Sequence, residues 1–229
     1  MKKVGLIGYG YWGKIIYQKL KSISDVQFIC RSDDTYVDKL DSVDWIFVVT
    51  PDKTHYEITK TCLEQGKNVF CEKPFTNNYK DAVNLFKLAQ ENNLKLYVDD
   101  VFNYRDEIDD LHNLINFEQE IKVIWNTDKS ENYLNRLAWH NFYMLYPIFK
   151  KTLNINWPKI NNVTFNYGIS NTKYHEVGGI DFTNKSNSND ALLKMLNKLL
   201  NNEKQIDFDY NKQITLRCQL ILDGVKNHV

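Results

Sequence analysis

Short apolar runs alternate with amphipathic stretches along the first part of the chain. Residues 45–51 begin with an unbroken apolar run, which is typical of a strand buried on both faces of a parallel sheet. Residues 12–23 instead repeat their isoleucines and leucine on one helical face. The predicted strands are residues 3–8, 26–32, 45–51, 68–74 and 94–100, and the predicted helices are 12–23, 55–66 and 81–93. This alternation predicts a doubly wound α/β sheet with right-handed crossovers.

The connection after the second predicted strand is short. Only about a dozen residues separate Ser32 from Trp45, and a complete helix plus a further strand needs more chain than that. We therefore expect a shortened connection that omits an element.

The second half of the chain has a different pattern. Aromatic and β-branched runs separated by Asn-rich turns predict strands, and longer periodic stretches predict helices. The predicted strands are 120–127, 163–170 and 178–183, and the predicted helices are 133–153, interrupted at Pro147, 191–202 and 214–228. We expect two domains: residues 1–115, and a smaller α+β domain over 116–229 with a mostly antiparallel sheet. The C-terminal helix of that second domain is the part expected to pack back on the first.

Composition narrows the function classes. The formal net charge is zero, which removes the electrostatic argument for a nucleic-acid or acidic-membrane partner. No apolar run approaches the roughly 18 residues that span a bilayer, and the N-terminus reaches glycines before it could form a signal-peptide core. The four cysteines form no Cys-x-x-Cys pair. We expect a cytoplasmic protein with neither a bound metal nor a membrane partner.

A glycine-rich turn follows the first predicted strand. Residues 8–13 read GYGYWG, between an apolar strand and a periodic helix, which is the context that a dinucleotide-binding turn requires. Gly8 would permit the tight turn, Gly10 would let the backbone approach a pyrophosphate, and Gly13 would allow close packing of helix on strand. The helix N-terminus at Tyr11 and Trp12 would supply amide donors to the phosphates. The alternative is a tight turn without a ligand.

The end of the second predicted strand bears on the choice of cofactor. An NAD site usually has an acidic residue there, which binds the ribose hydroxyls. Here the strand ends in Arg31 and Ser32, which can bind a 2′-phosphate. Asp33 and Asp34 are the opposing signal, because they could repel that phosphate or bind the ribose themselves. We expect NADP(H) to be favoured over NAD(H).

Residues 48–78, VVTPDKTHYEITKTCLEQGKNVFCEKPFTNN, closely resemble the glucose–fructose oxidoreductase/inositol dehydrogenase (Gfo/Idh/MocA) family. The family pattern is T-P-x-x-x-H after a strand, then a helix, G-K-x-V and E-K-P, and the likeness extends over roughly residues 3–115. The resemblance implies a Rossmann-type domain and an NAD(P)-dependent oxidoreductase. Because family members usually exceed 300 residues, it also implies a compact member with a shortened C-terminal domain.

The resemblance also implies roles for particular residues. Thr50 and Pro51 correspond to the loop beside the cofactor's ribose and nicotinamide, with His55 close by. Glu72 and Lys73 correspond to the E-K-P pair; the lysine lies beside the nicotinamide and the reacting carbon, and its peptide bond to proline is often cis. An ammonium group there can stabilise charge that develops on a substrate oxygen.

A second catalytic element of the family, D-x-x-x-H, is matched only in part. His140 stands in the place of the histidine that acts as general acid or base, but Arg136 replaces the aspartate and Asn141 follows. Packing within an aromatic helix is the alternative role for His140. Five residues are candidates for binding or lining the substrate site besides Lys73: Asn103, Tyr104, His140, Asn141 and Tyr143.

These observations predict hydride transfer between a nicotinamide and a hydroxyl or keto carbon of a sugar or nucleotide-linked sugar. One alternative is the reduction of a non-sugar substrate, as in biliverdin reductases, although these tend to lack the lysine of E-K-P. Another is a non-catalytic NADP-binding sensor, which would have little need of that lysine. The expected partners are a small-molecule substrate and a second copy in a homodimer, since relatives often dimerise through the second-domain sheet.

Overall fold

The computed structural model describes residues 1–32, 34–115, 119–127, 133–150, 155–170, 172–183 and 190–226, with the backbone alone for residues 133–136. The chain divides into two compact units. The first unit comprises Met1–Asp99 and Leu192–Leu216, and the second comprises Asp100–Ala191 and Arg217–Val229. The first break therefore lies after Asp99 rather than at the predicted residue 115, and a late segment of the chain returns to the first unit.

The first unit contains a five-stranded parallel sheet. Its strands are β1 (Lys3–Ile7), β2 (Asp25–Cys30), β3 (Trp45–Val48), β4 (Asn68–Cys71) and β5 (Leu96–Val98), in the order β2-β1-β3-β4-β5. Every residue of β3 is buried, as its unbroken apolar sequence requires. The predicted doubly wound parallel sheet is confirmed.

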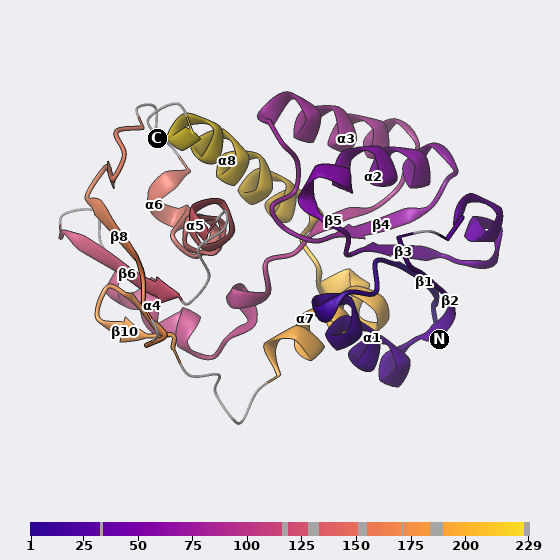
Figure 1. The fold of residues 1–229 in the computed structure, drawn as a ribbon, viewed down its shortest axis with the longest axis horizontal. Coiled ribbons are helices and arrows are strands. Elements are labelled where there is room, and N and C mark those ends of the chain that lie inside the picture. Colours follow the sequence, from indigo (N-terminus) through magenta and orange to yellow (C-terminus); the bar gives the residue numbers. More distant parts are fainter. Residues whose placement is uncertain are drawn as a thin grey trace. The chain divides into compact units, whose positions relative to one another are not determined.

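Helices cover both faces of this sheet. Helix α1 (Tyr11–Ile23) buries Ile16 and Leu20, while α2 (His55–Glu64) and α3 (Tyr79–Glu91) lie together on the opposite face (Figure 1). Short 3₁₀ segments stand at Asp52–Thr54 and at Val37–Ser42. The latter is the only helical element between β2 and β3 in the described residues, so the predicted shortened connection is confirmed.

The late segment completes the first unit. Helix α7 (Ala191–Asn201) lies beside α1 (Figure 1), and the Asn201 side chain donates a hydrogen bond to the carbonyl of Ile23. A 3₁₀ turn at Glu203–Gln205 leads into α8 (Phe208–Lys226). The Asn211 amide both donates to the Val98 carbonyl and accepts from the Val98 N–H, at 2.9 and 3.0 Å. It thereby satisfies backbone groups of β5, the last strand in the sheet order.

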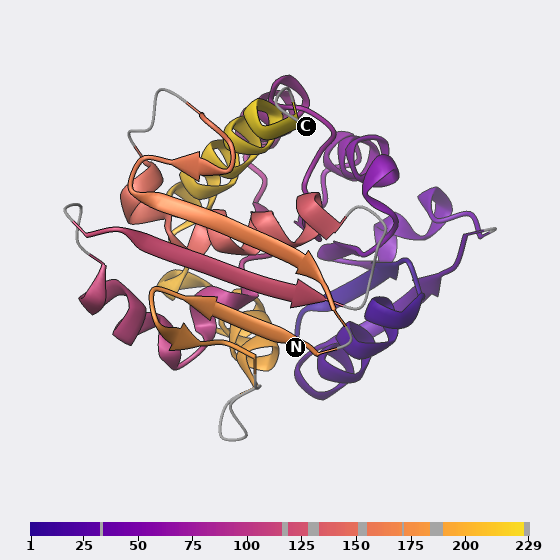
Figure 2. The same cartoon turned by 60° about the vertical axis from the view of Figure 1, so that its left-hand side comes forward.

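The second unit contains a mixed five-stranded sheet, whose strands β6 and β8 run across the front of Figure 2. Its strands are β6 (Ile121–Thr127), β7 (Lys159–Ile160), β8 (Val163–Ile169), β9 (Tyr174–Val177) and β10 (Ile180–Asp181), in the order β10-β9-β6-β8-β7. Only the β6–β8 pairing is parallel. Its helices are a 3₁₀ turn at Val101–Tyr104, α4 (Glu107–Leu114), α5 (Tyr133–Met144) and α6 (Tyr146–Phe149). The predicted α+β domain with a mostly antiparallel sheet is confirmed.

Three details of the second half of the chain differ from the predictions. The predicted strand 178–183 contains only the two-residue β10, and the preceding strand β9 was missed. The predicted long helix is broken at Leu145, so that Pro147 lies in the first turn of α6, where its missing N–H costs nothing. Helix α8 begins six residues before the predicted residue 214.

On β6 and β8, Lys122 and Asn166 are exposed, and Asn126 and Thr164 are half-buried. Ile124 of β6 is half-buried as well, and Ile169 at the end of β8 is 59% exposed. Within the described ranges no helix is both long and apolar enough to cross a membrane.

Candidate cofactor site and a second polar cluster

The predicted cofactor residues of the first unit lie at one edge of its sheet. Parallel strands end at the same edge, so the turns after β1, β3 and β4 are neighbours. The N–H of Val49 donates to the carbonyl of Ile7, and the N–H of Glu72 donates to that of Val48. The glycine turn, the Thr50 loop and the Glu72–Lys73 turn therefore lie side by side, where the order of strands reverses between β1 and β3.

The space available for a Cβ atom differs among the three glycines of the turn. Gly8 has φ +103°, and a Cβ there would lie 2.3 Å from the carbonyl oxygen of Val49. A Cβ on Gly13 would lie 2.1 Å from the carbonyl oxygen of Gly8. Around Gly10 no described atom lies within 4 Å of the position that a Cβ would take. Packing thus accounts for Gly8 and Gly13, whereas Gly10 faces open space.

The start of α1 fits an anionic group. Gly10 is its N-cap and provides no side-chain hydrogen bond, and the first turn carries no acidic residue. A helix N-terminus attracts negative charge through its unpaired N–H groups and its dipole. Together with the space at Gly10, these features fit the pyrophosphate of a dinucleotide. Tyr11, 81% exposed, stands at the same turn.

Trp12 connects the glycine turn to the Glu72–Lys73 turn. Its indole Nε1 donates a 2.5 Å hydrogen bond to Oε1 of Glu72, and the backbone N–H of Lys73 donates to Oε2 of the same carboxylate at 3.2 Å. Glu72 is buried, while the Lys73 side chain is half-buried. The Lys73–Pro74 peptide is cis, as the family resemblance implied.

His55 connects the Thr50 loop to the same turn from within the protein. Its Nε2 lies 2.8 Å from the Thr50 carbonyl oxygen, and its Nδ1 lies 2.8 Å from that of Pro74. Burial lowers the pKa of His55, and the two carbonyls oppose this shift. The ring is 1% exposed, so its placement supports a role in holding the two loops more than contact with a ligand. Pro51 is exposed beside Thr50.

Arg31 and Ser32 are both exposed at the end of β2. The Arg31 guanidinium lies over the ring of Tyr9, 5.6 Å from its centroid, within the range of a cation–π interaction. Tyr9 packs edge-on against Tyr17 of α1. The Asp34 carboxylate accepts the backbone N–H of Arg31 at 2.7 Å, so that carboxylate already has a donor. Asp33, part of the opposing signal, lies outside the described residues.

His140 lies in the second unit, on α5. Its Nδ1 is 2.6 Å from the hydroxyl oxygen of Tyr143, which also accepts the backbone N–H of Phe102. The Tyr143 hydroxyl has one proton and two lone pairs, so it can hold the ring of His140 either by donating to Nδ1 or by accepting from it. The side chain of Arg136, which replaces the family's aspartate, lies outside the described residues. Tyr143 therefore gives His140 an orienting contact, which the sequence alone did not reveal.

Asn141 is fully buried in a network of its own. Its Oδ1 accepts from Nε2 of His175, and its Nδ2 donates to the hydroxyl of Tyr167, both at 2.8 Å. His175 stacks on Trp125 with ring centroids 3.6 Å apart. Substrate binding by Asn141 stays a prediction, and its burial does not support it. Burial lowers the pKa of His175 to about 3, with Arg105 acting in the same direction and Asp181 against it.

Asn103 and Tyr104 lie on the 3₁₀ turn before Arg105 and are half-buried. Asn103 donates to Asp100 at 3.3 Å. Arg105 forms a two-pronged ion pair with Glu107, whose pKa it lowers, and donates to the carbonyl of Phe182. The guanidinium thus braces this turn against the end of the sheet.

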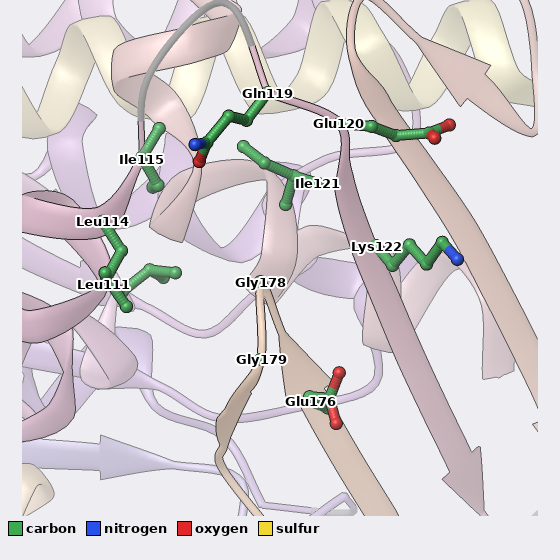
Figure 3. A pocket seen from close by; sticks show the side chains of 10 residues that line it. All are labelled: Leu111, Leu114, Ile115, Gln119, Glu120, Ile121, Lys122, Glu176, Gly178 and Gly179. Atoms are coloured by element: carbon green, nitrogen blue, oxygen red, sulfur yellow. The ribbon is translucent and has the colours of Figure 1, made fainter.

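The second unit also contains a cavity of about 310 Å³ (Figure 3). Leu111, Leu114, Ile115 and Ile121 form its apolar wall, and the Gly178–Gly179 turn borders it. None of the predicted site residues lines it. In the described part of the chain no group of His, Cys, Asp and Glu side chains is arranged to hold a metal ion.

The sequence reasoning missed Tyr9, His175 and Arg105, and it named Tyr143 only as a candidate for lining the substrate pocket. Tyr9 stands inside the recognised glycine turn, and Tyr143 follows His140 by three residues, so helical spacing could have indicated its contact with His140. His175 and Arg105 belong to no motif, and only the tertiary contacts reveal them.

The fold and this edge define the first unit as a Rossmann-type nucleotide-binding domain. Residues 16–100 match the family model GFO_IDH_MocA, described as an oxidoreductase family with an NAD-binding Rossmann fold. The match confirms, over these residues, the resemblance seen in the sequence.

Characterised relatives are similar over the same region. UDP-N-acetylglucosamine 3-dehydrogenase from Acidithiobacillus ferrooxidans is 29% identical over 112 residues, or 42% of this chain and 36% of the relative. The NADP(+)-dependent scyllo-inositol 2-dehydrogenase IolW from Bacillus subtilis is 29% identical over 115 residues, or 42% of this chain and 32% of the relative. The matched part thus spans about a third of each relative's length.

Solved structures extend the likeness in fold to the whole chain. The WlbA (WbpB) dehydrogenase from Thermus thermophilus, solved with NAD and UDP-GlcNAcA, superposes with a TM-score of 0.76 over 97% of this chain and 95% of that chain. The sequence identity is 14%, so this comparison supports the fold alone.

The glycine geometry yields a first prediction. Gly13→Ala should destabilise the protein, because its Cβ would meet the Gly8 carbonyl at 2.1 Å, and overpacking of this kind costs about 1–3 kcal/mol. Gly10→Ala, the matched control in open space, should melt within about 2 °C of the wild type, since a change of well under 1 kcal/mol shifts Tm little. Thermal denaturation followed by circular dichroism measures both. Equal melting temperatures for the two variants would contradict the packing argument.

His175 yields a second prediction. The unfolded chain binds a proton on this histidine below about pH 6.5, whereas the folded protein resists it down to a pKa of about 3. The free energy of unfolding should therefore fall as the pH drops through this window, by up to about 1.4 kcal/mol per pH unit from this group. Urea unfolding between pH 7 and pH 5 measures the slope. His175→Gln, which keeps a donor for Asn141, should have a shallower slope; an unchanged slope would refute the assignment.

Proposed function

We propose that the chain is an NAD(P)-dependent oxidoreductase that transfers hydride between the nicotinamide and a hydroxyl or keto carbon of a sugar or nucleotide-linked sugar. The observation that carries the proposal is the gathering of three turns at one sheet edge, in a domain that matches an NAD-binding oxidoreductase family. Two relatives named for dehydrogenation of a UDP-sugar and of an inositol support the substrate class.

In this proposal each turn has one task. The start of α1 and the open space at Gly10 receive the pyrophosphate. The Thr50 loop, held by His55, borders the ribose and nicotinamide. Lys73 directs its ammonium group to the substrate oxygen and stabilises the charge that develops there. The cofactor, when bound, supplies or accepts the hydride.

His140 is the proposed partner in proton exchange. With Nδ1 facing the Tyr143 hydroxyl, Nε2 is the ring nitrogen available to exchange a proton with the substrate oxygen. The hydrogen bond with Tyr143 takes the place of the carboxylate that usually orients such a histidine. Catalysis by His140 and substrate contact by Asn103 and Tyr104 are part of the proposal.

NADP(H) is the proposed cofactor in preference to NAD(H). Arg31 is exposed at the end of β2, beside Ser32, and its guanidinium rests on Tyr9. A guanidinium can bind a phosphate through two parallel hydrogen bonds. Asp34, the residue expected to oppose this phosphate, accepts the backbone N–H of Arg31 instead.

A cytoplasmic location and a homodimer stay predictions. All four cysteines, Cys30, Cys62, Cys71 and Cys218, are buried free thiols, which suits a reducing compartment. Burial raises the pKa of Cys62 to about 12, so its reactive thiolate is suppressed.

Cofactor preference is tested by fluorescence titration with NADPH and NADH. Arg31→Ala should weaken NADPH binding roughly ten- to a hundredfold, the worth of a hydrogen bond to a charged group, and should leave NADH binding nearly unchanged. Arg31→Lys keeps the positive charge but loses the planar guanidinium, so its NADPH affinity should lie between those of the wild type and Arg31→Ala. Equal affinity of the wild type for NADPH and NADH would contradict the Arg31 assignment.

Catalysis by Lys73 is tested with a panel of UDP-sugars, inositols and biliverdin, by following NADPH absorbance. Lys73→Ala should bind NADPH normally and lower kcat about 10²- to 10³-fold, as expected on removing a group that stabilises developing charge. Lys80→Ala, an exposed lysine on α3, is the matched control and should retain full activity. Turnover of biliverdin alone would favour the bilin reductase alternative. NADPH binding without any turnover by the wild type would favour the sensor.

A further inference from the structure

We propose that Trp12 and Glu72 are positioning residues that fix the Lys73 turn against the glycine turn. This inference rests on the proposed function only in that Lys73 is the group whose placement matters. It assigns Trp12 a role besides any contact with the cofactor: its indole binds the carboxylate of Glu72, which in turn holds the Lys73 turn.

The link joins segments that are far apart in the sequence. Trp12 is the second residue of α1, and its indole N–H reaches Oε1 of Glu72, 60 residues further along the chain. The second carboxylate oxygen accepts the backbone N–H of Lys73, and the backbone N–H of Glu72 is bound to the carbonyl of Val48. One carboxylate therefore connects the start of α1 to the main chain at Lys73, beside the end of β3.

The burial of Glu72 makes the connection between α1 and the Lys73 turn rigid. Glu72 is 5% exposed, and a carboxylate shielded from water is costly unless donors compensate it. Hydrogen bonds to an ionised acceptor are about twice as strong as neutral ones. Moving the Lys73 turn away from α1 would stretch one of these bonds, so the carboxylate favours a single placement of the turn.

The turn is also held from its other side. The ring of His55 lies between the carbonyls of Pro74 and Thr50, with Nδ1 2.8 Å from the first carbonyl oxygen and Nε2 2.8 Å from the second. The main chain around Lys73 is thus held at two points: the N–H of Lys73 through Glu72 and Trp12, and the carbonyl of Pro74, one residue further on, by the contact with His55. Lys73 extends from a fixed backbone, and this preorganisation is what a charge-stabilising group requires.

Nothing in phosphate binding by backbone N–H groups demands a large side chain at position 12. An indole at this position combines a planar ring with one N–H donor. Phenylalanine would keep most of the ring and lose the donor, so Trp12→Phe separates packing from the hydrogen bond. Glu72→Gln keeps the shape of the acceptor and removes its charge.

The test uses the full chain without cofactor or substrate. Lysines are labelled by reductive ¹³C-methylation, and the Lys73 signal is assigned by its loss in Lys73→Arg. We expect the Lys73 signal to move in Trp12→Phe and in Glu72→Gln, relative to the wild type. In ¹⁵N-labelled protein the Trp12 indole proton, assigned by its loss in Trp12→Phe, should move upfield in Glu72→Gln.

Trp45→Phe is the matched control. Trp45 is fully buried in β3, and its Nε1 has no hydrogen-bond partner in the described residues. This variant should lower the melting temperature and leave the Lys73 signal in place. A Lys73 signal that stays put in both Trp12→Phe and Glu72→Gln would overturn the inference, as would an equal movement in Trp45→Phe.

The outcome does not depend on the proposed function. If the wild type failed to bind NADPH, the cofactor proposal would fail, while the signals of the free protein would still report whether Trp12 and Glu72 fix Lys73. Should Trp12→Phe not fold, the Glu72→Gln variant alone decides, because it changes no volume in the buried site.

Discussion

The close approach of Gly13 to the carbonyl of Gly8 is the contact on which the candidate site depends. It seats the first turn of α1 directly on the end of β1, where any side chain at position 13 would meet a backbone oxygen. Parallel pairing then brings the ends of β3 and β4 to the same edge. With the helix start fixed there, Trp12 can reach Glu72, and the space at Gly10 stays open. The glycine turn therefore fixes the start of α1 and leaves open the space in which we propose that the pyrophosphate binds.

The sequence was sufficient to predict most of the first unit. Strands buried on both faces must be apolar throughout, and glycine at tight turns has no substitute, so β1, β3 and the glycine turn leave plain signals. The family motifs added Thr50, His55 and Lys73. These signals could not predict hydrogen bonds between residues that are far apart in the sequence. The bond from Trp12 to Glu72 and the two bonds between Asn211 and Val98 are of this kind, and no local sequence pattern marks them.

The second unit was harder to predict for a physical reason. Strand β9 reads YHEV, in which a buried histidine and a half-buried glutamate break the apolar alternation that marks a strand. His175 is tolerated there because it stays neutral, donates to Asn141 and stacks on Trp125. A contact within this unit also alters the interpretation of His140. Arg136 takes the place of the family's aspartate, but the hydroxyl of Tyr143 lies 2.6 Å from Nδ1 of His140, so the histidine still has a partner that orients its ring.

A crystal structure of the complex with NADPH tests the central claim most directly, because that claim concerns where each part of the cofactor binds. The account predicts electron density for the pyrophosphate at the start of α1 over Gly10, for the 2′-phosphate beside Arg31, and for the nicotinamide beside Lys73. Density for the dinucleotide away from the carboxyl edge of β1 and β3, or a nicotinamide out of reach of Lys73, would contradict it.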